Sequence, residues 1–315
     1  MNPSRTLVTG AAGFVGSWLV PVLQASGREP IGVHLPELAR GDAPIEWRAC
    51  DLRDRVAVAE LISTTRPDEI VHLAALASPS QAAGEPLEAL RANYLALDHL
   101  LAALAESAPS ARLLFVSTGE IYGFAPSGAT PWREGDRFRP QTIYAATKAA
   151  GERRVELAVE RDGLNVVIAR PFNHTGPGRP AIYAESSFAE QLARIERGLQ
   201  APVLRVGNLD AERDFSDVRD VVAAHVMLLE RGERGAAYNV CSGQALRIGA
   251  LLELLVARAR VKPRIEVDPE RWRPLPEGAS SLAGDASRLR ALGWRPAYAL
   301  ADTLDALLER WRASL

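Results

Sequence analysis

The sequence predicts an α/β fold, namely a Rossmann-like doubly wound parallel sheet with a smaller carboxyl-terminal substrate-binding region. Over the first 170 or so residues, short apolar runs alternate with amphipathic stretches, which is typical of a parallel sheet covered by helices on both faces. A glycine-rich turn directly follows the first apolar run and opens a helical pattern. Beyond residue 170, prolines such as Pro177, Pro180 and Pro274 divide the chain into short elements, which indicates a separate region.

The individual elements follow from the spacing of apolar residues. The expected strands are 6–9, 29–33, 45–49, 69–73, 113–117 and 166–170. The expected helices are 15–26, 55–64, 86–107, 144–162 and 188–197. The third of these helices is apolar over more than one stripe, which favours burial by the sheet and by a second subunit; its apolar residues include Leu95, Leu97, Leu100, Leu101 and Leu104. We therefore expect a homodimer formed by this helix and the one over 144–156.

The two regions of the chain are expected to interleave. Residues 1–170, joined by about 205–243, would form the dinucleotide-binding Rossmann domain, because the stretches 220–231 and 238–241 are expected to return to the main sheet. Residues of about 171–204 and 244–315 would form the substrate-binding region. We expect this region to fold over the carboxyl edge of the sheet.

Composition excludes several classes of partner. The 315 residues carry 37 basic and 39 acidic side chains, so the net charge of −2 gives no pull toward nucleic acid or an anionic membrane. Cys50 and Cys241 match no metal-ligand spacing and suit a reducing compartment. Nothing at the N-terminus resembles a signal peptide, so we expect none, and no apolar run approaches the roughly 20 residues of a membrane span. We expect a cytoplasmic protein without a metal.

The glycine-rich turn is a candidate phosphate site. Gly10, Gly13 and Gly16 lie between the first strand and the first helix, with Phe14 and Val15 opening that helix. Glycines there allow backbone N–H groups to approach a pyrophosphate at the positive end of a helix. The alternative is a simple turn with small packing residues. Its position in a strand–turn–helix unit favours nucleotide binding.

The end of the second strand bears on the choice of cofactor. A carboxylate there favours a free ribose 2′-hydroxyl, and a basic group favours a 2′-phosphate. The sequence has His34 without a well-placed acid, and Arg40 would reach a phosphate if the loop folds back. NADP(H) is therefore favoured, with NAD(H) possible. Asp51, followed by Leu52, is expected either to accept a hydrogen bond from the adenine amine or to cap the next helix.

Tyr144 and Lys148 are the candidate proton-transfer pair. The chain has only two lysines, Lys148 and Lys262, so a lysine four residues after a tyrosine suggests a need for a compact ammonium. Thr118 and Glu120 follow an apolar strand, at the edge where parallel sheets bind ligands. Alone, the pair would be a helix-surface contact. Together with the glycine turn, it indicates nicotinamide redox chemistry.

Several motifs carry a resemblance to a known family. GAAGFVG at 10–16, LAA at 73–75, STGEIYG at 117–123 and YAATK at 144–148 resemble the extended short-chain dehydrogenase/reductases of the NAD-dependent epimerase/dehydratase family. RPFNHTGPG at 170–178, VGNLDAERDFSDVRD at 206–220 and YNVCSG at 238–243 are similar to GDP-4-keto-6-deoxy-D-mannose reductases. The resemblance covers essentially the whole chain. It implies reduction of a GDP-linked 4-keto-6-deoxyhexose to GDP-D-rhamnose.

The resemblance also implies residue roles. Tyr144 would protonate the C4 oxygen as hydride arrives from the nicotinamide, Lys148 would hold the nicotinamide ribose and lower the pKa of Tyr144, and Thr118 would orient the ketone. Asn93 matches a family asparagine near the site, although a buried helix amide explains it equally well. Further cofactor contacts are expected at Leu73, Ala74, Ala75 and Pro171. Substrate contacts are expected at Thr118, Glu120, Asn173, Arg179, Asn208, Arg213 and Arg273.

Three alternatives remain open at the level of sequence. A nucleotide-sugar 4,6-dehydratase or epimerase would need further acid and base groups; Glu120 is a candidate base, but Gly119 stands where several sugar dehydratases carry an acid. A non-catalytic NADP-binding sensor would have no need of Tyr144, Lys148 and Thr118 together. For Arg213, an ion pair with a neighbouring aspartate competes with diphosphate binding. The nucleotide base, the hexose and the stereochemistry at C4 stay undetermined.

Overall fold

The computed structural model describes residues 3–38, 40–274 and 278–315 and is an α/β protein, as predicted. Its main sheet has seven parallel strands in the order β10-β6-β5-β4-β1-β2-β3. The chain order reverses at β1, which has β2 on one side and β4 on the other, so the carboxyl ends of β1 and β4 flank a topological switch point. The strands are β1 Arg5–Thr9, β2 Glu29–His34, β3 Glu46–Ala49, β4 Glu69–His72, β5 Arg112–Val116, β6 Asn165–Pro171 and β10 Ala237–Val240.

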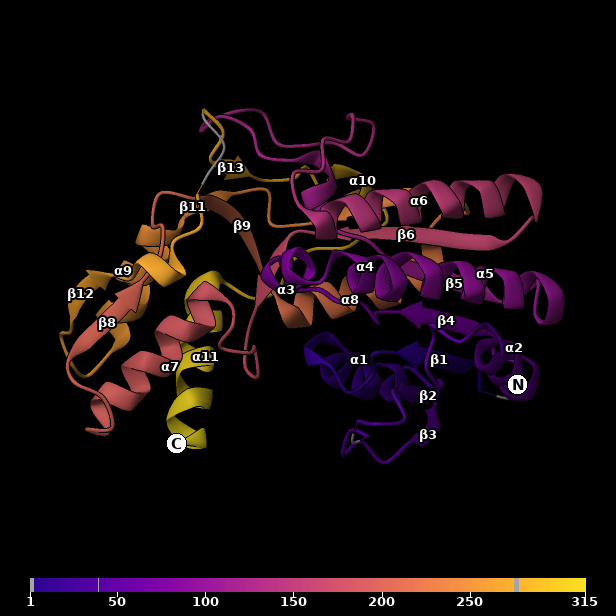
Figure 1. Cartoon of the computed structure of the whole chain (residues 1–315), viewed down its shortest axis with the longest axis horizontal. Coiled ribbons are helices and arrows are strands. Elements are labelled where there is room, and N and C mark those ends of the chain that lie inside the picture. Colours follow the sequence, from indigo (N-terminus) through magenta and orange to yellow (C-terminus); the bar gives the residue numbers. More distant parts are fainter. Residues whose placement is uncertain (1–2, 39, 275–277) are drawn as a thin grey trace.

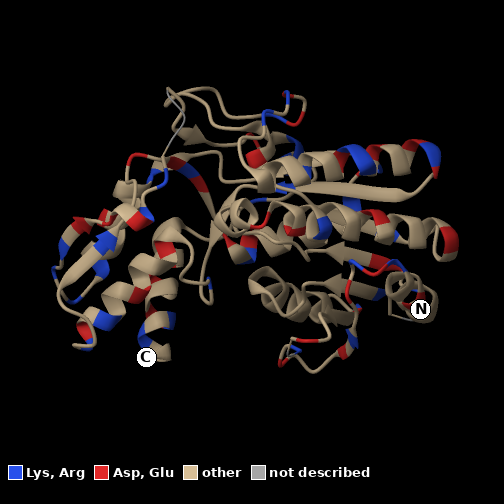
Figure 2. Cartoon of the chain, viewed as in Figure 1, with Lys and Arg blue, Asp and Glu red and all other residues tan. Residues whose placement is uncertain are grey.

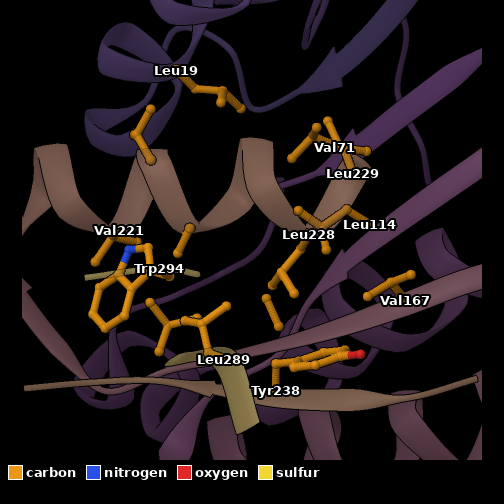
Figure 3. Packing of buried hydrophobic residues seen from close by; sticks show 14 of the residues in the cluster. Leu19, Val71, Leu114, Val167, Val221, Leu228, Leu229, Tyr238, Leu289 and Trp294 are labelled. Carbon is orange, nitrogen blue, oxygen red and sulfur yellow. The ribbon is translucent and has the colours of Figure 1, made fainter. Parts of the chain in front are cut away.

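Helices cover both faces of this sheet (Figure 1). One face carries α1 (Phe14–Ala25) and α8 (Val218–Arg231), and the other carries α2 (Arg55–Thr65), α5 (Ala96–Ser107) and α6 (Ile143–Arg161). Figure 3 shows the packing on the first face, where leucines and valines of α8 contact the strands, with Leu289 and Trp294 beside them. This two-sided burial explains why the strands are almost continuously apolar.

Capping fixes where two of these helices begin. The Asp54 carboxylate accepts hydrogen bonds from the first N–H groups of α2, so Asp54, rather than Asp51, is the cap. The Thr142 hydroxyl accepts a 3.1 Å hydrogen bond from the Ala145 N–H and caps α6. Such caps satisfy donors that the helix itself leaves free. The cap on α6 holds its first turn, which carries Tyr144.

The long helix expected over 86–107 is broken into three segments: α4 (Pro86–Leu90), the π-helical η1 (Arg91–Leu95) and α5. A further short helix, α3 (Pro79–Gly84), precedes them. Leu97, Leu100, Leu101 and Leu104 are buried within one chain, in the core that α5 forms with α2 and the sheet. A second subunit is therefore not needed to cover these four leucines, and the two-sided burial expected from the sequence is wrong for them.

The smaller region lies beside the carboxyl end of the main sheet (Figure 1). It holds a small sheet around β9 (Glu212–Asp217), which pairs with β7, β11 and β13, and a two-stranded sheet of β8 (Val203–Val206) and β12. Three helices form its core, α7 (Ala184–Glu196), α9 (Ile248–Arg258) and α11 (Leu300–Ser314). Its other elements are β7 Asn173–Thr175, β11 Ala245–Arg247, β12 Arg264–Val267, β13 Ser281–Leu282 and η3 Pro269–Arg271. Two short helices, η2 Gly119–Tyr122 and α10 Ser287–Ala291, lie against the core of the main sheet instead.

The sheets divide the segment expected to return to the Rossmann domain, about 205–243, between them. Only residues 218–240, which form α8 and β10, return to the main sheet, whereas β8 and β9 belong to the smaller region. Conversely, the late segment with α10 and Trp294 packs against the main core. The Trp294 indole N–H donates a 3.0 Å hydrogen bond to the Asp220 carbonyl and so holds this late segment against α8.

Basic and acidic residues are interspersed along both regions (Figure 2). In the part of the chain that the structure describes, no helix combines the length and apolar character needed to cross a membrane.

Candidate active site

The glycine turn forms a cradle that side chains would fill. Gly10 has φ +70°, and a Cβ on it would lie 2.9 Å from the Ala74 nitrogen. A Cβ on Gly16 would collide with the Gly10 carbonyl. Gly13 caps α1 without a side chain, and the first turn of α1 carries no acidic residue. The positive helix end is therefore open to a phosphate, and these residues fit a dinucleotide.

The neighbouring strand end completes this side of the site. Residues Leu73, Ala74 and Ala75 follow β4, and the Thr9 hydroxyl accepts a 3.2 Å hydrogen bond from the Ala74 N–H. The same hydroxyl bonds the His72 Nδ1 at 2.8 Å. The structure thus joins the glycine turn and the LAA motif at the switch point. Thr9 and His72, which sequence reasoning did not select, hold the two together.

The segment after β2 folds back onto the glycine turn. A Cβ on Gly41 would lie 3.6 Å from the Ala12 Cα and against the Trp47 ring, so the residue after Arg40 touches the turn. Arg40 itself is exposed. The His34 ring hydrogen-bonds the backbone carbonyls of Leu35 and Leu38 and so shapes this loop. The chain next to Arg40 thus passes close to the glycine turn.

Asp51 and Leu52 lie at the end of β3. Asp51 is held by Arg53, whose guanidinium and backbone N–H both donate to its carboxylate, and this pairing lowers the pKa of Asp51. The Leu52 side chain is buried, and its carbonyl accepts from the His99 ring. Asp51 is thus an ionised acceptor beside the strand end, in keeping with a role at the adenine.

Thr118, Glu120 and Tyr144 meet at the carboxyl end of β5. The Thr118 hydroxyl accepts a hydrogen bond from the Glu120 N–H at 3.2 Å and acts on the Tyr144 phenol by opposing the rise of its pKa. Burial, and secondly the charge of Glu120, raises the pKa of Tyr144 above its ordinary value. Burial likewise raises the pKa of Glu120, which Arg213 and Thr142 oppose. The phenol is therefore neutral over the neutral pH range.

Lys148 lies one helical turn from Tyr144 and is almost fully buried. Its ammonium donates a 2.8 Å hydrogen bond to the Val116 carbonyl and lies 5.1 Å from the centre of the Phe115 ring. Burial lowers the pKa of Lys148 to about 8. The expected tuning is not found: the pKa of Tyr144 is raised, and the cation that acts against this rise is Arg179.

Asn93 lies in η1 and is completely buried. Its carbonyl oxygen accepts a 2.7 Å hydrogen bond from the Leu76 N–H, and its amide donates to the Leu76 carbonyl and the Thr147 hydroxyl. Asn93 thus uses both ends of its amide within the protein. It ties the loop after β4 to α6, between Tyr144 and Lys148.

Asn173 and Arg213 enter the site from the smaller region. Strand β7 pairs with β9, placing Asn173 opposite Phe215, two positions after Arg213. The Arg213 guanidinium donates to the Glu212 and Ser280 carbonyls and lies 4.3 Å from the centre of the Phe124 ring. The neighbouring aspartates have other partners, since Asp214 binds Ser242 and Gly243, and Asp217 binds Arg219 and Thr303. The competing ion-pair interpretation of Arg213 is therefore wrong.

Asn208 and Arg273 lie next to each other, in the segments that follow β8 and η3. The Asn208 amide donates a 3.4 Å hydrogen bond to the Arg273 carbonyl, and the exposed Arg273 side chain donates to the Glu270 carbonyl. A cavity of about 520 Å³ lies beyond them, between α7 and the sheet of β8 and β12. Its polar lining residues are Ser187, Glu190, Gln191, Arg194, Gln200, Arg205, Arg264, Glu266 and Arg271.

The loop between β7 and α7 closes the other side of the site. Pro171 ends β6, and the chain continues through β7 to Arg179, which is 8% exposed. Arg179 lies 3.4 Å from the centre of the Tyr183 ring, and both side chains act on the Tyr144 phenol. Sequence reasoning missed Tyr183, because an isolated tyrosine before a helix gives no signal of a contact 39 positions earlier in the chain.

The structure brings the glycine turn, Thr118, Tyr144, Lys148 and Arg213 to one edge of the main sheet. Among the residues described, no three His, Cys, Asp or Glu side chains gather as metal ligands would. The arrangement can hold a dinucleotide on one side of the phenol and a polar substrate on the other. A neutral phenol such as that of Tyr144 can protonate a carbonyl oxygen.

Comparison with known proteins agrees with this geometry. A sequence model of the GDP-mannose 4,6 dehydratase family matches residues 7–307. The GDP-6-deoxy-D-mannose reductase of Pseudomonas aeruginosa is 37% identical over 98% of this chain and 97% of its own. The dTDP-6-deoxy-L-talose 4-dehydrogenase (NAD(P)(+)) of Kitasatospora kifunensis is 30% identical over 99% of this chain and 96% of its own.

Two solved structures match nearly the whole chain. The structure of RMD from Pseudomonas aeruginosa complexed with NADPH has a TM-score of 0.87 at 35% identity, covering 99% of this chain and 100% of that one. UDP-glucose 4-epimerase of Thermus thermophilus, in complex with NAD, has a TM-score of 0.88 at 30% identity and the same coverage. The protein therefore belongs to the GDP-mannose 4,6-dehydratase family of NAD-dependent epimerases, dehydratases and reductases.

Proposed function

We propose that this protein reduces the 4-keto group of GDP-4-keto-6-deoxy-D-mannose with NADPH and releases GDP-D-rhamnose. One observation carries the proposal most directly: a neutral, buried Tyr144 phenol and the buried Thr118 lie at the sheet edge that also bears the glycine cradle. The similarity to a GDP-6-deoxy-D-mannose reductase supports the choice of substrate.

Each residue has a defined task in this reaction. NADPH, when bound, supplies the hydride. Thr118 and Tyr144 bind the ketone oxygen, and Tyr144 gives it the phenolic proton. Reduction needs the protonated phenol, so a raised pKa of Tyr144 keeps the active form present at neutral pH. Lys148, one helical turn after Tyr144, would hold the nicotinamide ribose.

NADP(H) is the favoured cofactor. The fold-back of the segment after β2 brings the chain at Gly41 against the glycine turn, with Arg40 exposed beside it. A guanidinium there would bind the 2′-phosphate of NADPH, because its planar donors match phosphate oxygens in pairs. The structural match to an NADPH complex of a relative supports this choice.

The nucleotide sugar would lie between the main sheet and the smaller region. Asn173, Arg213 and Arg273 would bind the diphosphate, with Asn208 holding the Arg273 backbone. The adjoining cavity of about 520 Å³ is large enough for the nucleoside. Glu120 would position the sugar hydroxyls.

A dehydratase remains the second candidate because the family includes such enzymes. Reduction is favoured by the packing around Gly119. A Cβ at this position would lie 2.7 Å from Phe172 ring atoms, so the ring occupies the space of a side chain at position 119. An additional acid, as in several sugar dehydratases, therefore has no room here.

The protein would act as a homodimer in the cytoplasm. Four apolar side chains are exposed on α4, η1 and the start of α6, namely Leu87, Leu90, Leu95 and Ile143. A second copy of the chain would cover them. The interface would thus be formed by α4, η1 and α6 rather than by the buried face of α5.

A Tyr144→Phe variant tests the proton-transfer role. It retains the ring but lacks the proton, so we expect kcat for NADPH-dependent reduction to fall at least about 100-fold, while the Kd for NADPH changes little. Tyr298→Phe, at a partly exposed tyrosine outside the site, serves as the matched control. Unchanged kcat in Tyr144→Phe would show that another group delivers the proton.

A further inference from the structure

A cation–π contact joins the smaller region to the loop that follows η2. The guanidinium of Arg213, on β9, lies over the Phe124 ring, 4.3 Å from its centre. Phe124 comes directly after Gly123, where η2 ends, and η2 begins next to Thr118. Since a guanidinium is attracted to the face of an aromatic ring, the Phe124 ring restricts where the Arg213 side chain can lie.

The loop that carries this ring is itself tied to the smaller region. The Ala125 N–H donates a 2.8 Å hydrogen bond to the Ser281 carbonyl, and the Ala125 carbonyl accepts one of 2.9 Å from the Ser281 N–H. The Ser127 hydroxyl donates a 2.6 Å hydrogen bond to Glu212 on β9. The loop after Phe124 is therefore bound to the strand that also carries the arginine.

The hydrogen bonds of the Arg213 guanidinium all leave from one nitrogen. Its Nη1 donates to the Glu212 carbonyl at 2.8 Å and to the Ser280 carbonyl at 3.1 Å. Among the residues that the structure describes, none accepts a hydrogen bond from Nε or Nη2 of Arg213. These two nitrogens form one edge of the planar guanidinium, and such an edge binds two phosphate oxygens at once.

We propose that Phe124 is a positioning residue that holds the Arg213 guanidinium so that its Nε–Nη2 edge binds the diphosphate of the nucleotide sugar. The inference rests on the proposed function, which assigns Arg213 to that diphosphate. A freely rotating arginine loses rotamer freedom when it binds an anion, and a contact that is already formed removes part of that cost. Phe124 therefore raises the affinity for the nucleotide and takes no part in hydride or proton transfer.

The test compares Phe124→Leu, which removes the ring, with Phe124→Tyr, which keeps it. Phe124→Leu is made both in the wild-type protein and in Arg213→Gln. Tyr298→Leu is the matched control, because the Tyr298 ring lies 3.5 Å from a second guanidinium, that of Arg219. Calorimetry gives the Kd for GDP and, as a check that each variant is folded, the Kd for NADPH. Steady-state kcat and KM for reduction are measured alongside.

We expect the Kd for GDP and the KM for the nucleotide sugar to rise about fivefold in Phe124→Leu, as the loss of a cation–π contact predicts, while kcat and the Kd for NADPH stay within about twofold. Phe124→Tyr should bind GDP as the wild type does, and Tyr298→Leu should change none of these values. In the Arg213→Gln protein, Phe124→Leu should have no further effect on the Kd for GDP, because the two side chains act as one unit.

Wild-type affinity for GDP in Phe124→Leu, or an equal loss of affinity with and without Arg213→Gln, would overturn this inference alone. A loss that lies in kcat rather than in KM would overturn it as well. Wild-type affinity for GDP in Arg213→Gln would instead contradict the proposed function where it assigns Arg213 to the diphosphate.

Discussion

At the scale of single residues, burial acts in opposite directions on two neighbours. Tyr144 and Lys148 are one helical turn apart, and desolvation raises the pKa of the phenol while lowering the pKa of the ammonium to about 8. Both shifts favour the neutral forms of the side chains. The sequence identified the pair from its spacing, but the direction of the tyrosine shift depends on surrounding groups that lie far apart in the chain.

The Lys148 shift makes stability depend on pH. Because the folded-state pKa of about 8 lies below the ordinary 10.5, the unfolded chain holds one more proton than the folded chain between these values. Lys148 should therefore make the free energy of unfolding rise with pH across this window, by at most about 1.4 kcal/mol per pH unit. Denaturant unfolding of wild type and Lys148→Met at pH 8 and 10 measures the difference.

Lys262→Met is the control for this comparison, since Lys262 is the other lysine of the chain and is exposed. We expect its difference from wild type to be the same at both pH values. A constant difference between wild type and Lys148→Met over this window would contradict the burial of an ionisable lysine at position 148.

At the scale of elements, the N-terminus of α6 links stability to chemistry. Thr142 caps this helix two residues before Tyr144 and also donates a 3.4 Å hydrogen bond to Glu120. Thr142→Ala should lower the free energy of unfolding by about 1 kcal/mol and also lower kcat, because the first turn of α6 carries Tyr144. Chemical denaturation and steady-state kinetics measure the two effects.

Asp54→Ala provides the matched comparison, because Asp54 caps α2, which carries none of the reacting groups. We expect a similar loss of stability with unchanged kcat. If both variants kept wild-type kcat, the position of Tyr144 would not depend on the cap of its helix.

Local signals explain which elements were predicted from the sequence. The strands, the glycine turn and α6 were predicted because apolar periodicity and glycine spacing act within a few residues. The break at η1 was not, since it depends on the contacts of the buried Asn93 with Leu76 and Thr147. The pairing of β7 with β9, which brings Asn173 toward Arg213, joins segments about 40 residues apart and has no local signature.

At the scale of the whole molecule, the site depends on the placement of the smaller region over the sheet edge. Composition and proline content indicated such a region, but its short strands were not predicted, and neither was the late return of Trp294 to the main core. These features rest on packing between distant segments.

The proposed dimer is also a property of the whole molecule. Leu87 on α4 is 70% exposed and is the most exposed of the four apolar side chains proposed to lie in the interface. Leu87→Arg should convert a dimer to a monomer in sedimentation velocity, since a buried unpaired charge is costly at an interface. Leu199→Arg, at an exposed leucine in the smaller region, should leave the assembly unchanged. A wild-type monomer would contradict the proposed dimer.

The most direct test of the central claim is the identity of the product. The wild-type protein is incubated with NADPH and GDP-4-keto-6-deoxy-D-mannose, and the nucleotide sugar is analysed by NMR. We expect one equivalent of NADPH to be consumed for each GDP-D-rhamnose formed, with hydrogen delivered to C4. Recovery of unchanged 4-keto sugar with no oxidation of NADPH, while the cofactor binds, would contradict the proposed reductase.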